Sequence, residues 1–147
     1  MDTTTEVAPF RLLAYQLRKK QALVVQQDGV PHLEETPPNP TMSDSERTEI
    51  EGKVAESGRL EGRVALTTVG DGELTMRMIV RRLPAADLKK FVEGLNQKLG
   101  LGGEIGEFKV TEPTATHEAF VISYDVTKSN FIDWSKKGRI AVAACDI

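Results

Sequence analysis

The sequence is poor in the residue types that most often carry catalysis or bind metals. It has one cysteine, Cys145, and two histidines, His32 and His117, among 147 residues. A single cysteine excludes an intramolecular disulfide and a cysteine cage for a metal. The two histidines are isolated, with no HxxxH or HxH spacing, so we expect surface residues rather than ligands. We therefore expect no metal site and no cofactor.

Long apolar runs and an excess of basic charge are also missing. Nineteen Lys and Arg residues against 22 Asp and Glu residues give a formal net charge of −3. A chain without a basic excess cannot neutralise many phosphates, so we expect no nucleic-acid partner. No apolar run approaches the length of a membrane span. The first residues lack the basic and apolar regions of a signal peptide, which predicts a protein that stays where it is made.

Three regions of the chain differ in composition. Residues 1–36 form a mixed N-terminal arm. Residues 37–46 (PPNPTMSDSE) carry three prolines, which predicts an extended linker. Residues 47–147 have regular apolar patterns and are predicted to form one module.

The arm is predicted to contain one short helix and two short strands. Its helical signal is an apolar spacing of i, i+3, i+4 and i+7, formed by Phe10, Leu13, Ala14 and Leu17. Residues 22–25 are a strand candidate, Asp28-Gly29 is a turn signal, and Leu33 would lie on the returning strand.

The module begins with a predicted β-hairpin. Residues 47–54 and 60–69 alternate small or apolar side chains with charged or polar ones, and Ser57-Gly58 would make the turn. Glu49, Glu51 and Glu61 alternate with basic residues, which indicates a solvated sheet face with cross-strand ion pairs rather than an acid–base pair.

Two helices are predicted next. Residues 73–83 fit a strand and a helix equally well. Residues 85–99 form a clearer helix, in which Asn96 belongs to the polar side and Gly100 follows the end. The apolar stripe of this helix is Leu88, Phe91, Val92, Leu95 and Leu99.

Glycines 100, 102, 103 and 106 close this helix rather than open one, so they do not predict a phosphate-binding loop. Strands are expected over 105–110 and 120–126, with a last strand over 139–142. The order β-β-α-α-β-β-(β) predicts an α+β fold, an antiparallel sheet with helices on one face.

No complete catalytic set emerges from the residues alone. Cys145 could pair only with His32 or His117, and it lies three residues from the end of the chain. Trp134 is the only tryptophan, and it is interpreted as a packing anchor at the sheet edge, with a ligand platform as the alternative.

Several phrases, in order, resemble the C-terminal portion of bacterial transglutaminase-like proteins. They are DTTTEVAPF, the phrase around Lys20–Val24, the proline linker, the hairpin GRLEGRVALTTVG, and FKVTEPTATHEAFVISYDVTKSNFIDW. The resemblance implies that residues 73–83 are helical. It also implies that Asp2 matches the residue that orients the histidine of a papain-like Cys-His-Asp triad.

The resemblance also implies that the catalytic Cys and His would lie upstream of Met1. We therefore expect a non-catalytic C-terminal module, with residues 1–36 a remnant of the core's end. Its partner would be the missing core or another protein. Family members are usually secreted or periplasmic. The alternative is an independent interaction module that binds a protein, peptide or glycan through its sheet face or the side carrying Trp134.

Overall fold

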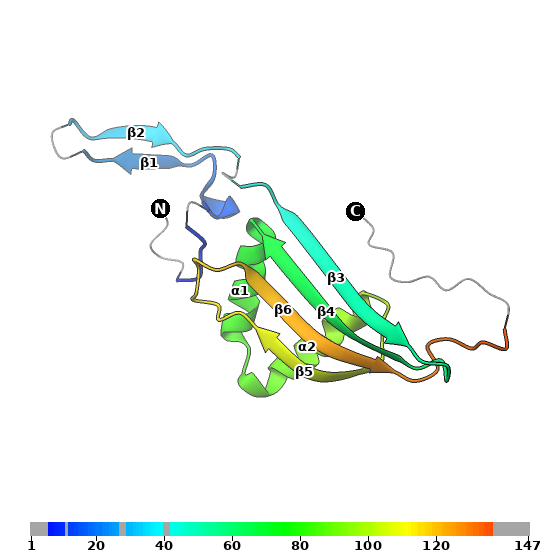
Figure 1. The fold of residues 1–147 in the computed structure, drawn as a ribbon. Coiled ribbons are helices and arrows are strands. Elements are labelled where there is room, and N and C mark those ends of the chain that lie inside the picture. Colours follow the sequence, from blue (N-terminus) through cyan, green and yellow to red (C-terminus); the bar gives the residue numbers. More distant parts are fainter. Residues whose placement is uncertain (1–5, 11, 27–28, 40–41, 137–147) are drawn as a thin grey trace.

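The fold is built around a four-stranded antiparallel sheet covered on one face by two helices. The computed structural model describes residues 6–10, 12–26, 29–39 and 42–136. The strands are β3 (Ser45–Val54), β4 (Leu60–Val69), β5 (Glu104–Val110) and β6 (Phe120–Lys128), in the order β3-β4-β6-β5. Helices α1 (Asp71–Arg82) and α2 (Leu88–Lys98) lie on the same face of the sheet (Figure 1). The predicted α+β class is confirmed.

The main core lies between the sheet and the two helices. Alternate residues of β4 and β6 point into it, because successive side chains of a strand face opposite sides. The buried members are Val64, Val80, Val92, Leu101, Ile105, Phe120, Ile122, Tyr124 and Val126. The predicted apolar stripe of α2 is confirmed: Val92 is fully buried, and its other members pack against this core.

Polar side chains inside the core tie its loops to the helices. Asn96, expected on the polar side of α2, is 1% exposed and donates from Nδ2 to the Gly102 carbonyl at 2.7 Å. The Tyr124 hydroxyl donates to Asn96 Oδ1 at 3.4 Å. Burial raises the pKa of Tyr124 to about 12, because the phenolate would lose its hydration. The prediction of an exposed Asn96 was wrong because the loop after α2 folds back over it.

Arg77 of α1 is the largest buried polar side chain in the described part of the chain. Its side chain is completely buried, with its Cζ 5.0 Å from the centroid of the Phe120 ring. Its Nε donates to Glu73 Oε1 at 2.8 Å. Its two terminal nitrogens donate to the carbonyls of Glu112, Pro113 and Glu118 at 3.3, 3.0 and 2.6 Å. The hydrogen bonds of the guanidinium therefore hold the connection between β5 and β6 against α1.

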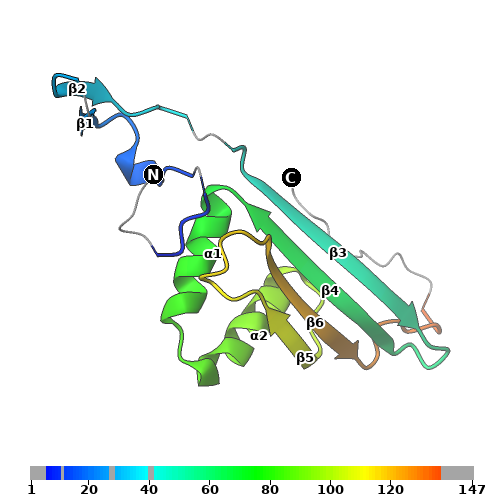
Figure 2. The same ribbon diagram turned by 60° about the vertical axis from the view of Figure 1, so that its left-hand side comes forward.

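The N-terminal arm forms a two-stranded ribbon instead of a helix followed by strands. Strands β1 (Gln21–Val24) and β2 (His32–Glu35) pair antiparallel, as predicted. The predicted helix is wrong: the described residues of this segment form a 3₁₀ turn, η1 (Tyr15–Leu17), and no α-helix. Figures 1 and 2 show the ribbon extending away from the sheet and helices. Asp28, at the expected turn, lies outside the described residues.

The segment before the ribbon is anchored on α1. Val7, Leu12 and Ala14 form a second buried cluster with Leu74. Arg18 holds the Asp71 carboxylate with both terminal nitrogens, at 2.6 and 2.8 Å, and also donates to the Leu13 carbonyl. Burial of these apolar side chains, and not the helical spacing of their neighbours, decides the conformation here.

The remaining helical segments agree closely with those predicted from the sequence. Residues 73–82 lie in α1 and Leu83 is its C-cap, which resolves the strand-or-helix ambiguity of residues 73–83 toward helix. A 3₁₀ turn, η2 (Ala85–Asp87), precedes α2, and Gly100 follows α2 with a φ of 72°. The proposed last strand over 139–142 lies outside the described residues. No helix of the described part is long and apolar enough to cross a membrane.

Candidate functional site

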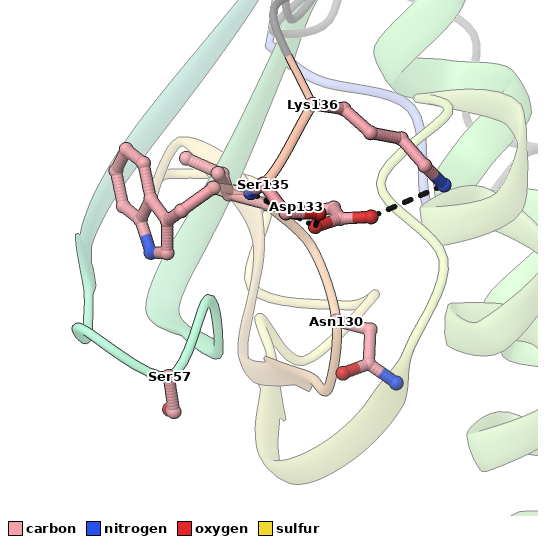
Figure 3. A pocket seen from close by; sticks show the side chains of 7 residues that line it. Ser57, Asn130, Asp133, Ser135 and Lys136 are labelled. Carbon is pink, nitrogen blue, oxygen red and sulfur yellow. Dashed lines mark hydrogen bonds and ion pairs between the residues drawn. The ribbon is translucent and has the colours of Figure 1, made fainter.

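A hollow lies at the end of the sheet where β3 turns into β4. Its volume is about 650 Å³. It is lined by Ser57, Asn130, Ile132, Asp133, Trp134, Ser135 and Lys136. Figure 3 shows that one wall comes from the β3–β4 turn and the other from the segment that follows β6. A volume of this size is within the usual range of small-molecule sites.

Gly58 brings these two walls together. It lies in the left-handed region with a φ of 77°, and its carbonyl accepts from the Ile132 backbone N–H at 3.0 Å. A Cβ at this position would overlap with the Ile132 carbonyl oxygen. Glycine is thus required both for the turn and for the close approach of the second segment. The predicted turn at Ser57-Gly58 is confirmed.

The polar side of the hollow is organised by Asp133. Its Oδ1 accepts from the hydroxyl of Ser135 at 2.6 Å and from the Ser135 backbone N–H at 3.1 Å, and its Oδ2 lies 3.1 Å from Lys136 Nζ. These contacts, led by the Ser135 hydroxyl, lower the pKa of Asp133 because they favour the carboxylate. Asp133 is therefore charged and already engaged, which makes it a poor general acid.

Trp134 presents its ring beside this hollow. The residue is 63% exposed, so the interpretation as a packing anchor was wrong. An exposed indole offers an apolar face and a single N–H donor.

A second candidate surface is the arm itself. The large apolar side chains that the described residues expose are concentrated between residues 10 and 33. These are Phe10, Tyr15, Leu17, Leu23, Val25, Val30 and Leu33. Leu23 and Leu33 are directly paired across the ribbon and are 64% and 67% exposed. Paired residues share a face of a two-stranded ribbon, so these two leucines form an apolar stripe on one side.

Among the residues considered for catalysis, His32 and His117 lie within the described part of the chain. Asp2 and Cys145 lie outside the described residues. His32 begins β2 on the ribbon, whereas His117 lies in the connection before β6, with Nε2 3.5 Å from a Glu118 carboxylate oxygen. Across the described ranges, no group of three or more His, Cys, Asp or Glu side chains is placed to hold a metal ion.

The sheet face opposite the helices carries alternating charges, but their pairing differs from the prediction. Glu49 pairs with Arg47 of the same strand at 2.8 Å, and Glu61 pairs with Arg59, the residue just before β4, at 3.0 Å. The cross-strand pair is Arg63 with Asp125 at 2.9 Å, and this carboxylate raises the pKa of the arginine. A shallow hollow of about 60 Å³ lies beside Arg63. All of these ion pairs are exposed and contribute little stability.

The chain was compared with protein-family models, curated proteins and solved structures, and none of them matches it. The resemblance to transglutaminase-like proteins therefore rests on the sequence phrases alone and stays a prediction.

Proposed function

We propose that this chain is a non-catalytic accessory module that docks onto a partner protein through the β1–β2 ribbon. The observation that carries the proposal is the exposed pair Leu23 and Leu33, on a ribbon that extends from the folded body (Figure 2).

The ribbon needs a partner for physical reasons. A two-stranded ribbon alone is marginally stable in water, and three strands or a packed face are normally required. Complete burial of an exposed leucine contributes roughly 1.5–3 kcal/mol. Covering Leu23 and Leu33 together would therefore stabilise a complex appreciably.

The base of the ribbon is held in a fixed geometry. The Thr36 hydroxyl donates to the Leu17 carbonyl at 2.6 Å and accepts from the Lys20 backbone N–H at 2.9 Å. Backbone bonds also join Lys19 to Thr36 and Thr36 to Lys20. A ribbon fixed at its base loses less conformational entropy on binding, which favours docking.

The sequence resemblance supplies the candidate partner, a bacterial transglutaminase-like core. In that arrangement the described module would pack against the core and supply no catalytic side chain. This part of the proposal rests on the sequence phrases around Asp2 and Lys20–Val24.

Docking can be tested by isothermal titration calorimetry of the chain with a purified transglutaminase-like core. We expect binding by the natural chain and at least tenfold weaker binding by the double variant Leu23→Ser/Leu33→Ser, a loss of about 1.4 kcal/mol or more. Ile79→Ser, an equally simple change of an exposed apolar residue on α1, serves as the control. Undiminished binding by the double variant would refute docking through the ribbon.

The absence of catalysis needs its own assay. The purified chain should hydrolyse and transamidate glutamine side chains no faster than buffer. Turnover that disappears in Asp2→Ala or Cys145→Ala would show that the chain is an enzyme.

The hollow beside Trp134 favours a second candidate function, the binding of a glycan. Its lining combines an exposed indole with hydroxyl, amide and charged side chains, which suits a ligand with both an apolar ring face and hydroxyl groups. Trp134 is the only tryptophan, so its fluorescence reports directly on this site. Titration with neutral oligosaccharides should quench it saturably, and Asn130→Ala should weaken the effect. A linear response without saturation would refute this function.

A further inference from the structure

We infer that two copies of this chain pair through their β3 edge strands, in an antiparallel register centred on Gly52. The two four-stranded sheets would then join into one continuous sheet. This surface is separate from the ribbon, and the inference does not depend on the proposed function.

β3 offers a long and regular edge. All ten of its residues pair with β4 without a bulge, and no other strand of the described residues pairs with β3. Figures 1 and 2 show β3 as the outermost strand on its side of the sheet. A strand edge of this length that no other described strand pairs with is a template for pairing with another chain.

The hairpin fixes which backbone groups face outward. Ala55 N–H donates to the Arg59 carbonyl, so odd-numbered residues of β3 bond to β4. The even-numbered residues then direct N–H and C=O toward the free edge. They include Ile50, Gly52 and Val54. An antiparallel partner must therefore bond to even-numbered residues, which limits the possible registers.

The charges select one register among these. With Gly52 opposite Gly52 of the second copy, Glu51 faces Lys53 twice across the two-fold axis. Glu51 and Lys53 would form a non-hydrogen-bonded pair of the antiparallel ladder. The side chains of such a pair lie closer together than those of a hydrogen-bonded pair. Neither Glu51 nor Lys53 has an ion-pair partner among the described residues. A register centred on Ile50 instead places Glu49 opposite Glu51 and Arg47 opposite Lys53, which opposes like charges four times.

The helix-facing side of β3 agrees with the same register. Ile50 then lies opposite Val54, which is 37% exposed in the single chain. A register centred on Thr48 also places opposite charges across from each other, Arg47 and Glu49. These two residues already form an ion pair within one strand. In this register Ile50 would also lie opposite the charged Glu46. Gly52 at the axis presents no side chain to its counterpart. Charge, apolar contact and backbone direction thus favour the Gly52 register.

Charge reversal followed by charge exchange tests this pairing. Sedimentation velocity over about a hundredfold range of concentration should show a monomer–dimer equilibrium for the natural chain. Glu51→Lys alone and Lys53→Glu alone should each weaken the dimer at least tenfold, because each places like charges opposite one another twice. The double exchange Glu51→Lys/Lys53→Glu should restore it. Both changed positions are exposed, and circular dichroism will confirm that the three variants fold.

Two controls separate this edge from other surfaces. Lys109→Glu changes an exposed charge on β5, the opposite edge strand, and should leave the dimer unchanged. The ribbon variant Leu23→Ser/Leu33→Ser should dimerise like the natural chain. The inference is overturned by a monomer at all concentrations, by a dimer that neither single reversal weakens, by failure of the double exchange to restore it, or by a dimer that the ribbon variant abolishes.

Discussion

Replacement of Arg77 by alanine is the most informative perturbation of this fold. The side chain is fully buried and contacts Glu73, whose side chain is only 6% exposed, together with three backbone carbonyls of the β5–β6 connection. Arg77→Ala leaves the carboxylate without its cation and the carbonyls without donors. Removing one partner of a buried ion pair costs about 3–5 kcal/mol. For a chain of this size the melting temperature should fall by about 10 °C.

Urea denaturation followed by circular dichroism measures this loss directly. Arg81→Ala is the matched control, because Arg81 lies one turn later on α1 and its pair with Glu6 at 3.3 Å is exposed. That control should change the free energy of unfolding by less than about 0.5 kcal/mol. The double variant Arg77→Met/Glu73→Leu removes both charges yet leaves the three carbonyls unpaired, so about 1–3 kcal/mol of destabilisation should remain. The reasoning is refuted if the decrease in the free energy of unfolding for Arg77→Ala is within about 1 kcal/mol of the decrease for Arg81→Ala.

Three further predictions concern the arm, the core and the hollow. Arg18→Ala should destabilise the chain by about 1–2 kcal/mol in denaturation, because it removes a half-buried pair with Asp71 and the bonds to Leu13; a cost as small as that of Arg47→Ala would contradict this. The raised pKa of Tyr124 means that the unfolded chain loses this proton first. Its contribution to stability is therefore complete below pH 10 and is lost as pH rises toward about 12. Unfolding titrations of Tyr124→Phe should lack this part of the alkaline decline. Gly58→Ala should cost about 1–3 kcal/mol in denaturation because of its positive φ and the overlap with Ile132, whereas Gly94→Ala, on α2 with open space around it, should not destabilise.

Local pattern predicted the sheet and the second helix well. Phe120, Ile122, Tyr124 and Val126 alternate strictly with less buried residues, and the structure buries all four. The stripe of α2 has helical spacing, and a glycine follows its end. These signals are reliable because each depends on the side of a single element that faces the core.

The interior polar residues could not be predicted in this way. Arg77 is one of several charged residues in α1, and nothing local separates it from the exposed Arg81. Its three carbonyl acceptors lie 35–41 residues further along the chain, so only the folded arrangement of the β5–β6 connection makes its burial possible. Asn96 was misplaced for the same reason, since its acceptor belongs to the loop that folds back over α2.

The candidate site was predicted only in part. The rarity of tryptophan draws attention to Trp134, but the hollow depends on the contact between Gly58 and Ile132, which are far apart in sequence. The arm helix was wrong because apolar spacing does not show which side chains have a surface to pack on. Val7, Leu12 and Ala14 find that surface on α1, while Leu17 stays exposed.

The position of β6 beside β4 also has a consequence for synthesis of the chain. Partners across these two strands lie between 52 residues apart, for Thr68 and Phe120, and 68 residues apart, for Leu60 and Lys128. The β3–β4 hairpin can therefore form on the ribosome well before β4 acquires its second neighbouring strand, β6. During that interval the edge of β4 at Val64 and Leu66 has no strand to pair with. The nascent chain is therefore most prone to aggregation before β6 emerges.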